Sequence, residues 1–199
     1  MRFVLVVGNP KPQSRTLTVA REAADAVLDA AGQPRGYRVI DLCVLARHLL
    51  LPEPSPAVED ALEQVQGAHA LLVASPTYKG TYTGLLKVFL DRLPHRGLDG
   101  VTGLPLLVMG LPAHRPSVEA HLRPLLEELG ADVPVPGLAV MESDLADTGP
   151  VLRPWAAQVA PALAQANTLV EANSLALAEP NSLAKANSLA LAQERRPVP

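Results

Sequence analysis

Cysteine, aromatic side chains and long apolar runs are all scarce in this chain of 199 residues. Its one cysteine, Cys43, excludes an internal disulfide and a metal site built from several cysteines, and is most simply a small apolar residue. The five histidines stand apart, without the spacing of metal ligands. No apolar run approaches the roughly 20 residues that a membrane-spanning helix needs. We therefore expect a cytoplasmic protein that has no metal site and does not enter a membrane.

An excess of charge is also lacking. The formal net charge of −3 and the sequence pI near 5.9 give no electrostatic case for nucleic acid as a partner. Apolar residues make up 48% of the chain, which is enough to bury one good core. The length favours one domain with a further segment appended.

The chain opens with an apolar strand at residues 2–7 and a polar turn at residues 8–16 that leads into a helix. The first amides of a helix have no partner within it, and the helix dipole places partial positive charge there. Such a turn can bind a phosphate. Ser14 and Thr16 add hydroxyl donors, and the guanidinium of Arg15 adds a positive charge with several N–H donors.

The same turn departs from the common nucleotide-binding loops. Gln13 stands where a Walker loop has its second glycine, and Ser14 replaces the lysine of that loop. The three glycines of a dinucleotide fingerprint are missing too. We predict a single phosphate, with backbone donors from Lys11 and from residues 13–16, because the intervening prolines carry no N–H. An ordinary polar strand-to-helix turn is the alternative.

Apolar periodicity alternates between strand and helix over residues 1–165. Strands are predicted at residues 2–7, 37–42, 68–75, 105–110 and 137–141, and helices at residues 17–31, 57–66, 83–93, 117–129 and 152–164. This alternation predicts an α/β domain with a doubly wound, five-stranded parallel sheet of order 2-1-3-4-5 and helices on both faces. Such sheets bind ligands at the carboxyl ends of their strands, here the loops at residues 8–15, 75–82 and 110–116.

The second of these loops is the most specific part of the sequence. Residues 75–94 read SPTYKGTYTGLLKVFLDRLP and meet every fixed position of a pattern close to S/T-P-x-Y-x-x-x-Y-x-G-x-L-K. The opening turn meets the pattern G-S-x-x-x-x-S-R apart from Asn9, which can still donate and accept hydrogen bonds. Together the two stretches resemble the NAD(P)H-dependent FMN reductases of flavodoxin-like fold, in particular the alkanesulfonate-utilisation type. The resemblance covers about residues 1–165.

The resemblance implies FMN and NADPH, or NADH, as ligands. The residues that it places at the flavin are Asn9, Ser14, Arg15, Thr16, Pro76, Thr77, Tyr78, Lys79, Gly110 and His114. Ser14, Arg15 and Thr16 would hold the phosphate, and Pro76 to Lys79 would lie along the polar edge of the ring system. Leu111 replaces a family glycine, so we expect the third loop to differ if its backbone needs a positive φ. His114 is expected more readily as an exposed loop residue than as a chemical group.

The implied function is hydride transfer from a nicotinamide to FMN. Because the cofactors supply this chemistry, no acid–base residue is assigned. The resemblance also implies a flavin-dependent monooxygenase as acceptor and a homodimer or homotetramer. The predicted helix at residues 83–93 is apolar enough to pair with a second subunit, but the same residues could serve only the core. Three alternatives remain: an FMN-bound quinone or azo reductase, a flavodoxin-like electron carrier, and an interaction protein that retains the fold.

The C-terminal segment, residues 166–199, differs in composition from the rest. Residues 167–180 and 181–194 form a tandem repeat of fourteen residues, rich in alanine and leucine but punctuated by asparagine and serine. We interpret it as a loose or partly helical tail. The alternative is an oligomerisation helix, with Leu169, Leu177, Leu183 and Leu191 on one broad face.

Overall fold

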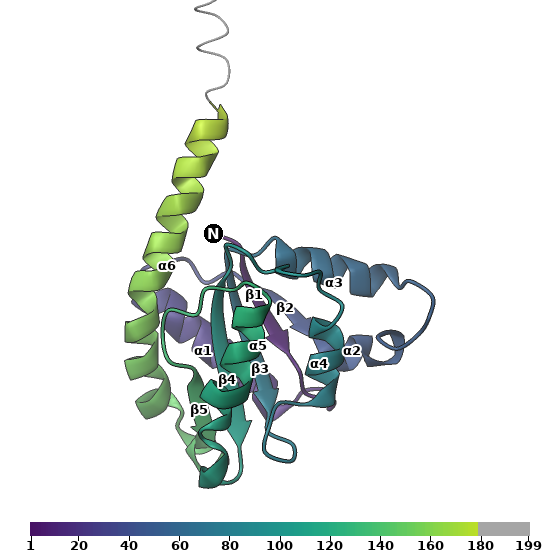
Figure 1. The fold of residues 1–199 in the computed structure, drawn as a ribbon. Coiled ribbons are helices and arrows are strands. Elements are labelled where there is room, and N and C mark those ends of the chain that lie inside the picture. The colour runs from purple at the N-terminus through teal and green to yellow at the C-terminus, as the bar shows by residue number, and fades with distance from the viewer. Residues whose placement is uncertain (179–199) are drawn as a thin grey trace, which may run out of the picture.

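One parallel sheet forms the centre of the computed structural model, which describes residues 1–178. Its strands are β1 (Phe3–Val7), β2 (Arg38–Asp41), β3 (Ala70–Pro76), β4 (Thr102–Met109) and β5 (Leu138–Met141) (Figure 1). They lie in the order β2-β1-β3-β4-β5, and every neighbouring pair is parallel. The predicted doubly wound sheet of order 2-1-3-4-5 is therefore confirmed.

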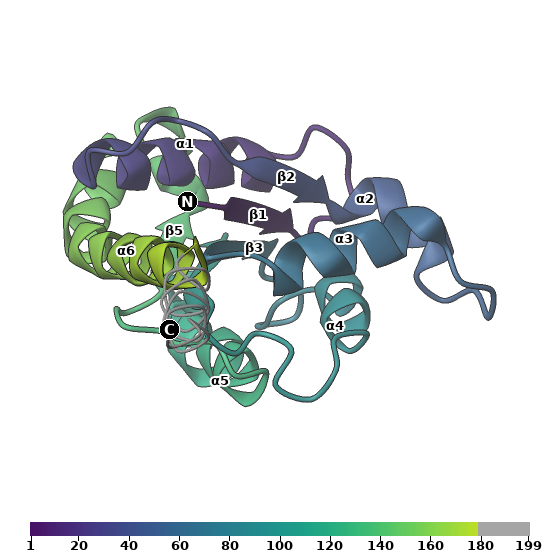
Figure 2. The same cartoon turned by 90° about the horizontal axis from the view of Figure 1, so that it is seen from above.

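Helices cover both faces of this sheet (Figure 2). On one face α1 (Arg15–Ala30) packs against α6 (Gly149–Ala178). The other face is covered by α3 (Pro56–Gln66), α4 (Gly84–Leu90) and α5 (Arg123–Glu128). All side chains of β1, β3 and β4 are buried, as parallel strands between two helical layers require.

Several elements differ from the sequence prediction. Strand β4 begins at Thr102 instead of residue 105, and α4 ends at Leu90 instead of residue 93. The second strand ends at Asp41, not Leu42, because the Asp41 carboxylate accepts a hydrogen bond from the Cys43 amide (3.3 Å) and caps the short helix α2 (Leu42–Leu45). A 3₁₀ turn, Ala46–His48, follows. One helix predicted at residues 117–129 is instead a π-helical turn, Val118–Leu122, followed by α5. Pro124 explains the break in the α-helix, because proline has no N–H to donate to a carbonyl one turn earlier.

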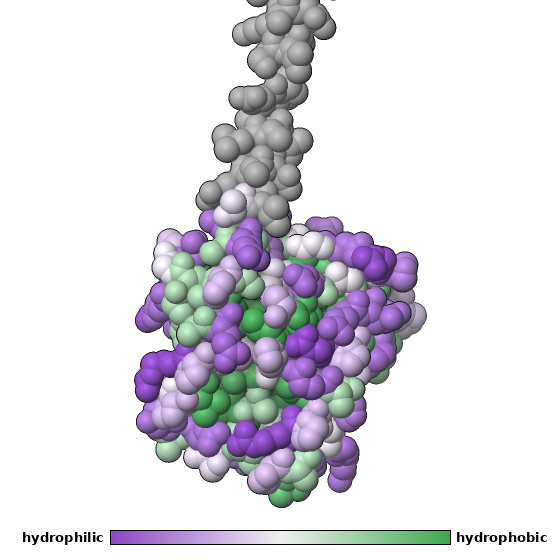
Figure 3. All heavy atoms as spheres, turned by 60° about the vertical axis from the view of Figure 1, so that its left-hand side comes forward, coloured by the Kyte–Doolittle hydropathy of each residue, from purple (hydrophilic) through white to green (hydrophobic). Residues whose placement is uncertain are grey.

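The helix predicted to pair subunits serves the core of this chain. Leu86, Phe89 and Leu90 of α4 are fully buried, and Leu85 packs against them while partly buried. The core alternative therefore accounts for these side chains, and the expected homo-oligomer stays a prediction. Figure 3, which brings the side with α6 forward, shows apolar areas divided by hydrophilic side chains.

Helix α6 runs unbroken through the boundary expected between residues 165 and 166, as far as Ala178. The polar residues of the first repeat do not end it: the Thr168 hydroxyl donates to the Ala164 carbonyl one turn earlier (3.0 Å). The second repeat, with Leu183 and Leu191, lies outside the described residues, and so do the side chains of Leu169 and Leu177. Within residues 1–178 no helix is both long and apolar enough to cross a membrane.

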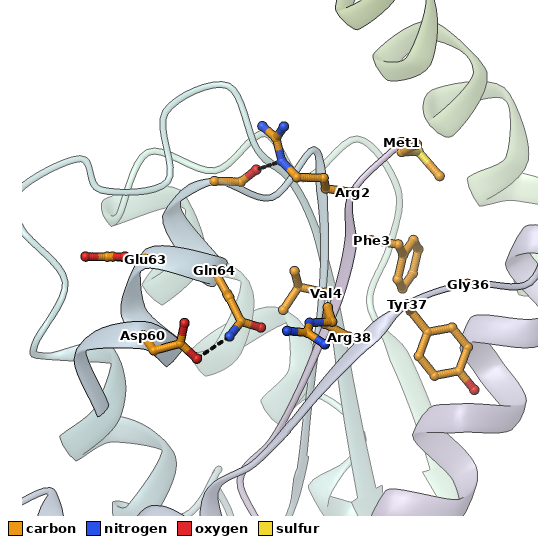
Figure 4. Close-up of a pocket in the computed structure, with 11 residues that line it drawn as sticks. Met1, Arg2, Phe3, Val4, Gly36, Tyr37, Arg38, Asp60, Glu63 and Gln64 are labelled. Atoms are coloured by element: carbon orange, nitrogen blue, oxygen red, sulfur yellow. Dashed lines mark hydrogen bonds between the residues drawn. The ribbon is translucent and has the colours of Figure 1, made fainter. Parts of the chain in front are cut away.

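A cavity of about 570 Å³ opens at the amino ends of β1 and β2 (Figure 4). Phe3 and Val4 form part of its wall. Two of its polar side chains, Arg2 and Asp60, already have partners, the Gly67 carbonyl (2.5 Å) and the Gln64 amide (2.6 Å). Because parallel sheets bind ligands at the opposite edge, we do not place the functional site here.

His69 joins β3 to the start of the chain and makes stability depend on pH. Its Nδ1 accepts a hydrogen bond from the Arg2 amide (2.8 Å), which requires the neutral ring. Partial burial, Arg2 and the N-terminal amine lower the pKa of His69 below its ordinary value. The unfolded chain therefore binds a proton that the folded chain resists, and the free energy of unfolding falls as the pH drops below the unfolded-state pKa.

We expect the replacement His69→Asn to flatten this dependence, because the amide oxygen can still accept from Arg2 but does not titrate. Urea unfolding between about pH 7 and pH 5 should show a smaller loss of stability in the variant than in the unaltered chain. His121→Asn, at an exposed position, is the control. Parallel curves for all three proteins would contradict the prediction.

Candidate functional site

Four loops meet where the strands of the sheet end. Because β1, β3, β4 and β5 are parallel, the residues after Val7, Pro76, Met109 and Met141 lie at one edge. Three of these loops are those predicted from the sequence. The fourth, the 3₁₀ turn Glu142–Ala146, is an addition from the structure.

A cavity of about 380 Å³ lies among these loops. Its lining includes six of the predicted site residues: Asn9, Ser14, Arg15, Thr16, Pro76 and Tyr78. The other four, Thr77, Lys79, Gly110 and His114, lie in the adjoining loops outside its lining. Lys11, Val108 and Glu142 also line it, so two cationic side chains face one carboxylate at this edge.

The first loop is held in shape by its own side chains. The buried Asn9 donates to the Thr16 hydroxyl (3.0 Å) and accepts from the Lys11 amide (3.0 Å). Ser14 caps α1 by accepting from the Leu17 amide (3.2 Å). The amide of Lys11 is therefore used within the loop, and our expectation that it serves a phosphate is corrected.

The other predicted backbone and hydroxyl donors of this loop have no acceptor among the described residues. The backbone amides of residues 13–16 make no hydrogen bond there, since the first turn of a helix has no earlier carbonyls to receive them. The hydroxyls of Ser14 and Thr16 accept but do not donate. This concentration of unused donors at a helix start fits an anion such as a phosphate monoester.

The second loop is a tight hairpin. Tyr78 pairs with Thr81 through its amide (2.8 Å), and the two residues between them, Lys79 and Gly80, both have positive φ, 56° and 84°. These are the features of a type I′ turn. The Thr77 amide donates to the Val108 carbonyl (2.8 Å).

These hydrogen bonds reduce the number of backbone amides in this loop that could donate to a flavin. The amides of Thr77 and Tyr78 are used inside the protein, so only those of Lys79 and Gly80 remain as donors from the turn. The Tyr78 side chain is 44% exposed and presents a flat face at the cavity.

The third loop supports the hairpin from the opposite side. The half-buried His114 places Nδ1 3.5 Å from the Thr77 hydroxyl, and its ring lies beside Gly80. Ser117 donates to the Gly80 carbonyl (2.6 Å). Leu111 has an extended backbone, φ −121°, so the positive φ that we considered for this position is not needed.

A buried hydroxyl connects the first two loops. Thr83 caps α4 by accepting from the Leu86 amide (3.1 Å), and it donates to the Gly8 carbonyl (2.5 Å). Its own amide donates to Ser75, whose side chain is fully buried (3.0 Å). The sequence pattern indicated a helix start at Thr83 but not this contact with the phosphate-binding turn, which depends on two strands lying side by side.

Gly8 lies so close to α4 that a larger residue does not fit. A Cβ at position 8 would stand 2.6 Å from the Cβ of the fully buried Leu86. We expect Gly8→Ala to lower the free energy of unfolding by about 1–3 kcal/mol, because the overpacked turn must move away from the helix. FMN affinity should fall with it. Gly36→Ala, in open space, is the control, and equal urea midpoints for the two variants would refute the prediction.

The structure also finds a site residue that the sequence analysis missed. Glu142 accepts a hydrogen bond from Arg15 (Nη2 to Oε1, 2.8 Å), although 127 residues separate the two. The side chains of Arg15 and Glu142 are 68% and 48% exposed. The signal that could have indicated Glu142 is its position directly after the fifth predicted strand, at the same edge as the other loops.

Within the described part of the chain, no three His, Cys, Asp or Glu side chains gather as metal ligands would. The site has three parts: the unused hydrogen-bond donors at the start of α1, the hairpin with the exposed ring of Tyr78, and the ion pair of Arg15 and Glu142. Such a site can hold an anionic group beside a flat ring.

Comparison with known proteins agrees with this geometry. Residues 1–145 match the family model described as NADPH-dependent FMN reductase. An Escherichia coli protein named FMN reductase (NADPH) is 42% identical over 148 residues, which cover 74% of this chain and 76% of that protein. A Pseudomonas putida protein named NADH-dependent FMN reductase SfnF is 31% identical over 63% of this chain and 69% of its own length.

A solved structure gives the same result. The apo form of the NADH:FMN oxidoreductase EMOB superposes with a TM-score of 0.71 and 30% identity over 81% of this chain and 89% of its own. The fold is also similar to that of a flavodoxin from the domain Archaea, with a TM-score of 0.52 and 16% identity over 81% of this chain and 99% of its own.

Proposed function

The chain belongs to the NADPH-dependent FMN reductase family, and on that premise we propose that it reduces FMN with NADPH at the carboxyl edge of its sheet. The observation that supports this most directly is the set of unused donors at the start of α1, inside a cavity bordered by an aromatic hairpin. A phosphate needs such donors, and a flavin ring needs such a face. The protein is thus an oxidoreductase of flavodoxin-like fold.

The phosphate of FMN is assigned to the first loop. The amides of residues 13–16 and the hydroxyls of Ser14 and Thr16 would donate to it, and Arg15 would add a charge-assisted bond. Asn9 holds this loop in shape through Thr16 and the Lys11 amide instead of reaching the ligand through its own amide group.

The ring system is assigned to the hairpin and the third loop. The amides of Lys79 and Gly80 are free to donate to its polar edge, and Tyr78 offers an exposed aromatic face. Pro76 lines the floor. Thr77 and His114 brace the hairpin, and Gly110 follows β4 directly, beside the Glu142 side chain.

FMN, when bound, supplies the ring that accepts a hydride from the nicotinamide, so the protein supplies binding, orientation and exclusion of water. No described side chain is assigned as an acid or base. Lys79 and Arg115 are exposed cations beside the site, and we assign them to the phosphates of the pyridine nucleotide.

FMN is proposed to exchange as a substrate and leave reduced for a separate flavin-dependent monooxygenase. The exposed mouth of the cavity, at Arg15 and Glu142, supports exchange over permanent binding. NADPH is proposed as donor because the more similar relative carries that name, while SfnF makes NADH the necessary comparison. A cytoplasmic setting and a homo-oligomer stay predictions.

The test mixes the purified full-length chain with FMN and either NADPH or NADH, and follows the absorbance of the reduced nicotinamide. We expect oxidation well above the flavin-only blank, with a rate that saturates as FMN increases. Oxidation no faster than the blank would refute the reductase function. Turnover of a quinone at catalytic FMN concentrations, without loss of FMN on gel filtration, would favour an FMN-bound quinone reductase instead.

A further inference from the structure

Among the described residues, Glu142 is the one carboxylate in the lining of the cavity to which we assign the phosphate. It follows β5 directly, and its Oε1 lies 2.8 Å from Nη2 of Arg15, which also lines the cavity. The Asp144 carboxylate accepts from the Met141 amide (3.0 Å) and so fixes the backbone from which Glu142 projects. The carboxylate of Glu142 is thereby held beside the first loop.

A carboxylate is an unexpected neighbour for a phosphate. The FMN phosphate carries a charge of about −1.5 to −2 near neutral pH, and it seeks the same guanidinium that Glu142 holds. Entry of FMN therefore requires Arg15 to divide its donors between two anions or to leave Glu142. Like charges at the half-exposed mouth also repel, more strongly at low salt.

We propose that Glu142 sets the affinity for flavin: its carboxylate competes with the FMN phosphate for Arg15 and keeps binding weak enough for reduced FMN to leave. This inference rests on the proposed function and names a residue that favours exchange. Glu142 does not touch the reacting atoms and acts through Arg15 as a positioning residue. The opposite role, in which Glu142 orients Arg15 toward the phosphate, predicts a change of opposite sign.

The test is Glu142→Gln, which keeps the size of the side chain and removes its charge. Titration by quenching of flavin fluorescence should give a Kd for FMN about three- to tenfold lower than in the unaltered chain, as expected for loss of one nearby like charge. The Kd for riboflavin, which has no phosphate, should stay the same. In the reductase assay KM for FMN should fall in the same proportion, and kcat should fall if flavin release limits turnover.

Two controls accompany this variant. Glu128→Gln makes the same change of net charge at an exposed position on α5, with no partner among the described residues, and should leave both Kd values unchanged. The difference in the Kd for FMN between the unaltered chain and Glu142→Gln should become smaller when the sodium chloride concentration rises to about 0.5 M, because salt screens exposed charges. A matching thermal midpoint would show that the fold is intact.

Each result supports or overturns the inference. An FMN Kd that is unchanged or higher in Glu142→Gln overturns it, and so does equal tightening of riboflavin. If the unaltered chain binds neither FMN nor riboflavin, the proposed function itself fails and the inference falls with it. Binding of FMN by the unaltered chain, without tightening in the variant, leaves the proposed function standing.

Discussion

Replacement of Thr83 by valine is expected to lower the free energy of unfolding by about 2–4 kcal/mol, the sum of a lost helix cap and a buried carbonyl left without its donor. Valine matches the shape of threonine but has no hydroxyl. The Leu86 amide then loses its acceptor (3.1 Å) and the Gly8 carbonyl its donor (2.5 Å), at a residue only 3% exposed. Urea unfolding followed by circular dichroism measures the difference.

The matched control is Thr83→Ser, which retains both hydrogen bonds and loses one methyl group. It should lie within about 1.5 kcal/mol of the unaltered chain, as expected for deletion of a single buried methyl. Because Gly8 begins the turn that we propose binds the phosphate, Thr83→Val should also weaken FMN binding. A valine variant as stable as the serine variant would show that the hydroxyl contributes little.

Replacement of Arg15 by alanine is expected to raise the Kd for FMN by about ten- to a hundredfold, the range for loss of a charge-assisted hydrogen bond. Part of this increase in Kd comes from repulsion between the phosphate and the Glu142 carboxylate, which loses its cationic partner when Arg15 is removed. Stability should change by less than about 1 kcal/mol, because the side chain is 68% exposed and surface ion pairs contribute little. Flavin fluorescence titration and urea unfolding are the two measurements.

Arg21→Ala is the control for this variant, since it removes a charge from an exposed position further along α1. Its Kd for FMN should stay close to that of the unaltered chain. Riboflavin affinity should be the same in all three proteins, because riboflavin lacks the phosphate. If Arg15→Ala binds FMN normally, the phosphate lies elsewhere and the first loop has another role.

Much of the fold was predictable because local patterns specify it. Wholly apolar runs predict buried parallel strands, and the run at β3 was found within two residues of its observed start, Ala70. Shorter features escaped: α2 has four residues, too few for helical periodicity, and the π-helical turn before α5 depends on a single proline. The last helix was predicted to end at residue 164, with a loose or partly helical tail after it; α6 instead continues into the first repeat, where the Thr168 hydroxyl bonds to its own helix.

The candidate site was only partly predictable for a different reason. Residue types and spacing indicate which loops hold polar groups, but not which donors are already used. The Lys11 amide donates to the Asn9 side chain. The amides of Thr77 and Tyr78 donate to the carbonyls of Val108 and Thr81, so none of these three amides is free for a ligand. Hydrogen bonds of this kind depend on backbone angles that sequence spacing does not contain.

By itself the sequence determined the class of fold, because the periodicity that specifies it follows from neighbouring residues. It also indicated the edge of the sheet at which we propose that a ligand binds, and two local motifs gave the resemblance to the family. Only the tertiary structure decided that Thr83 joins the first turn to α4 and that Glu142 meets Arg15 across the cavity. Both contacts join residues far apart in the chain, and their geometry exists only after the strands have aligned side by side.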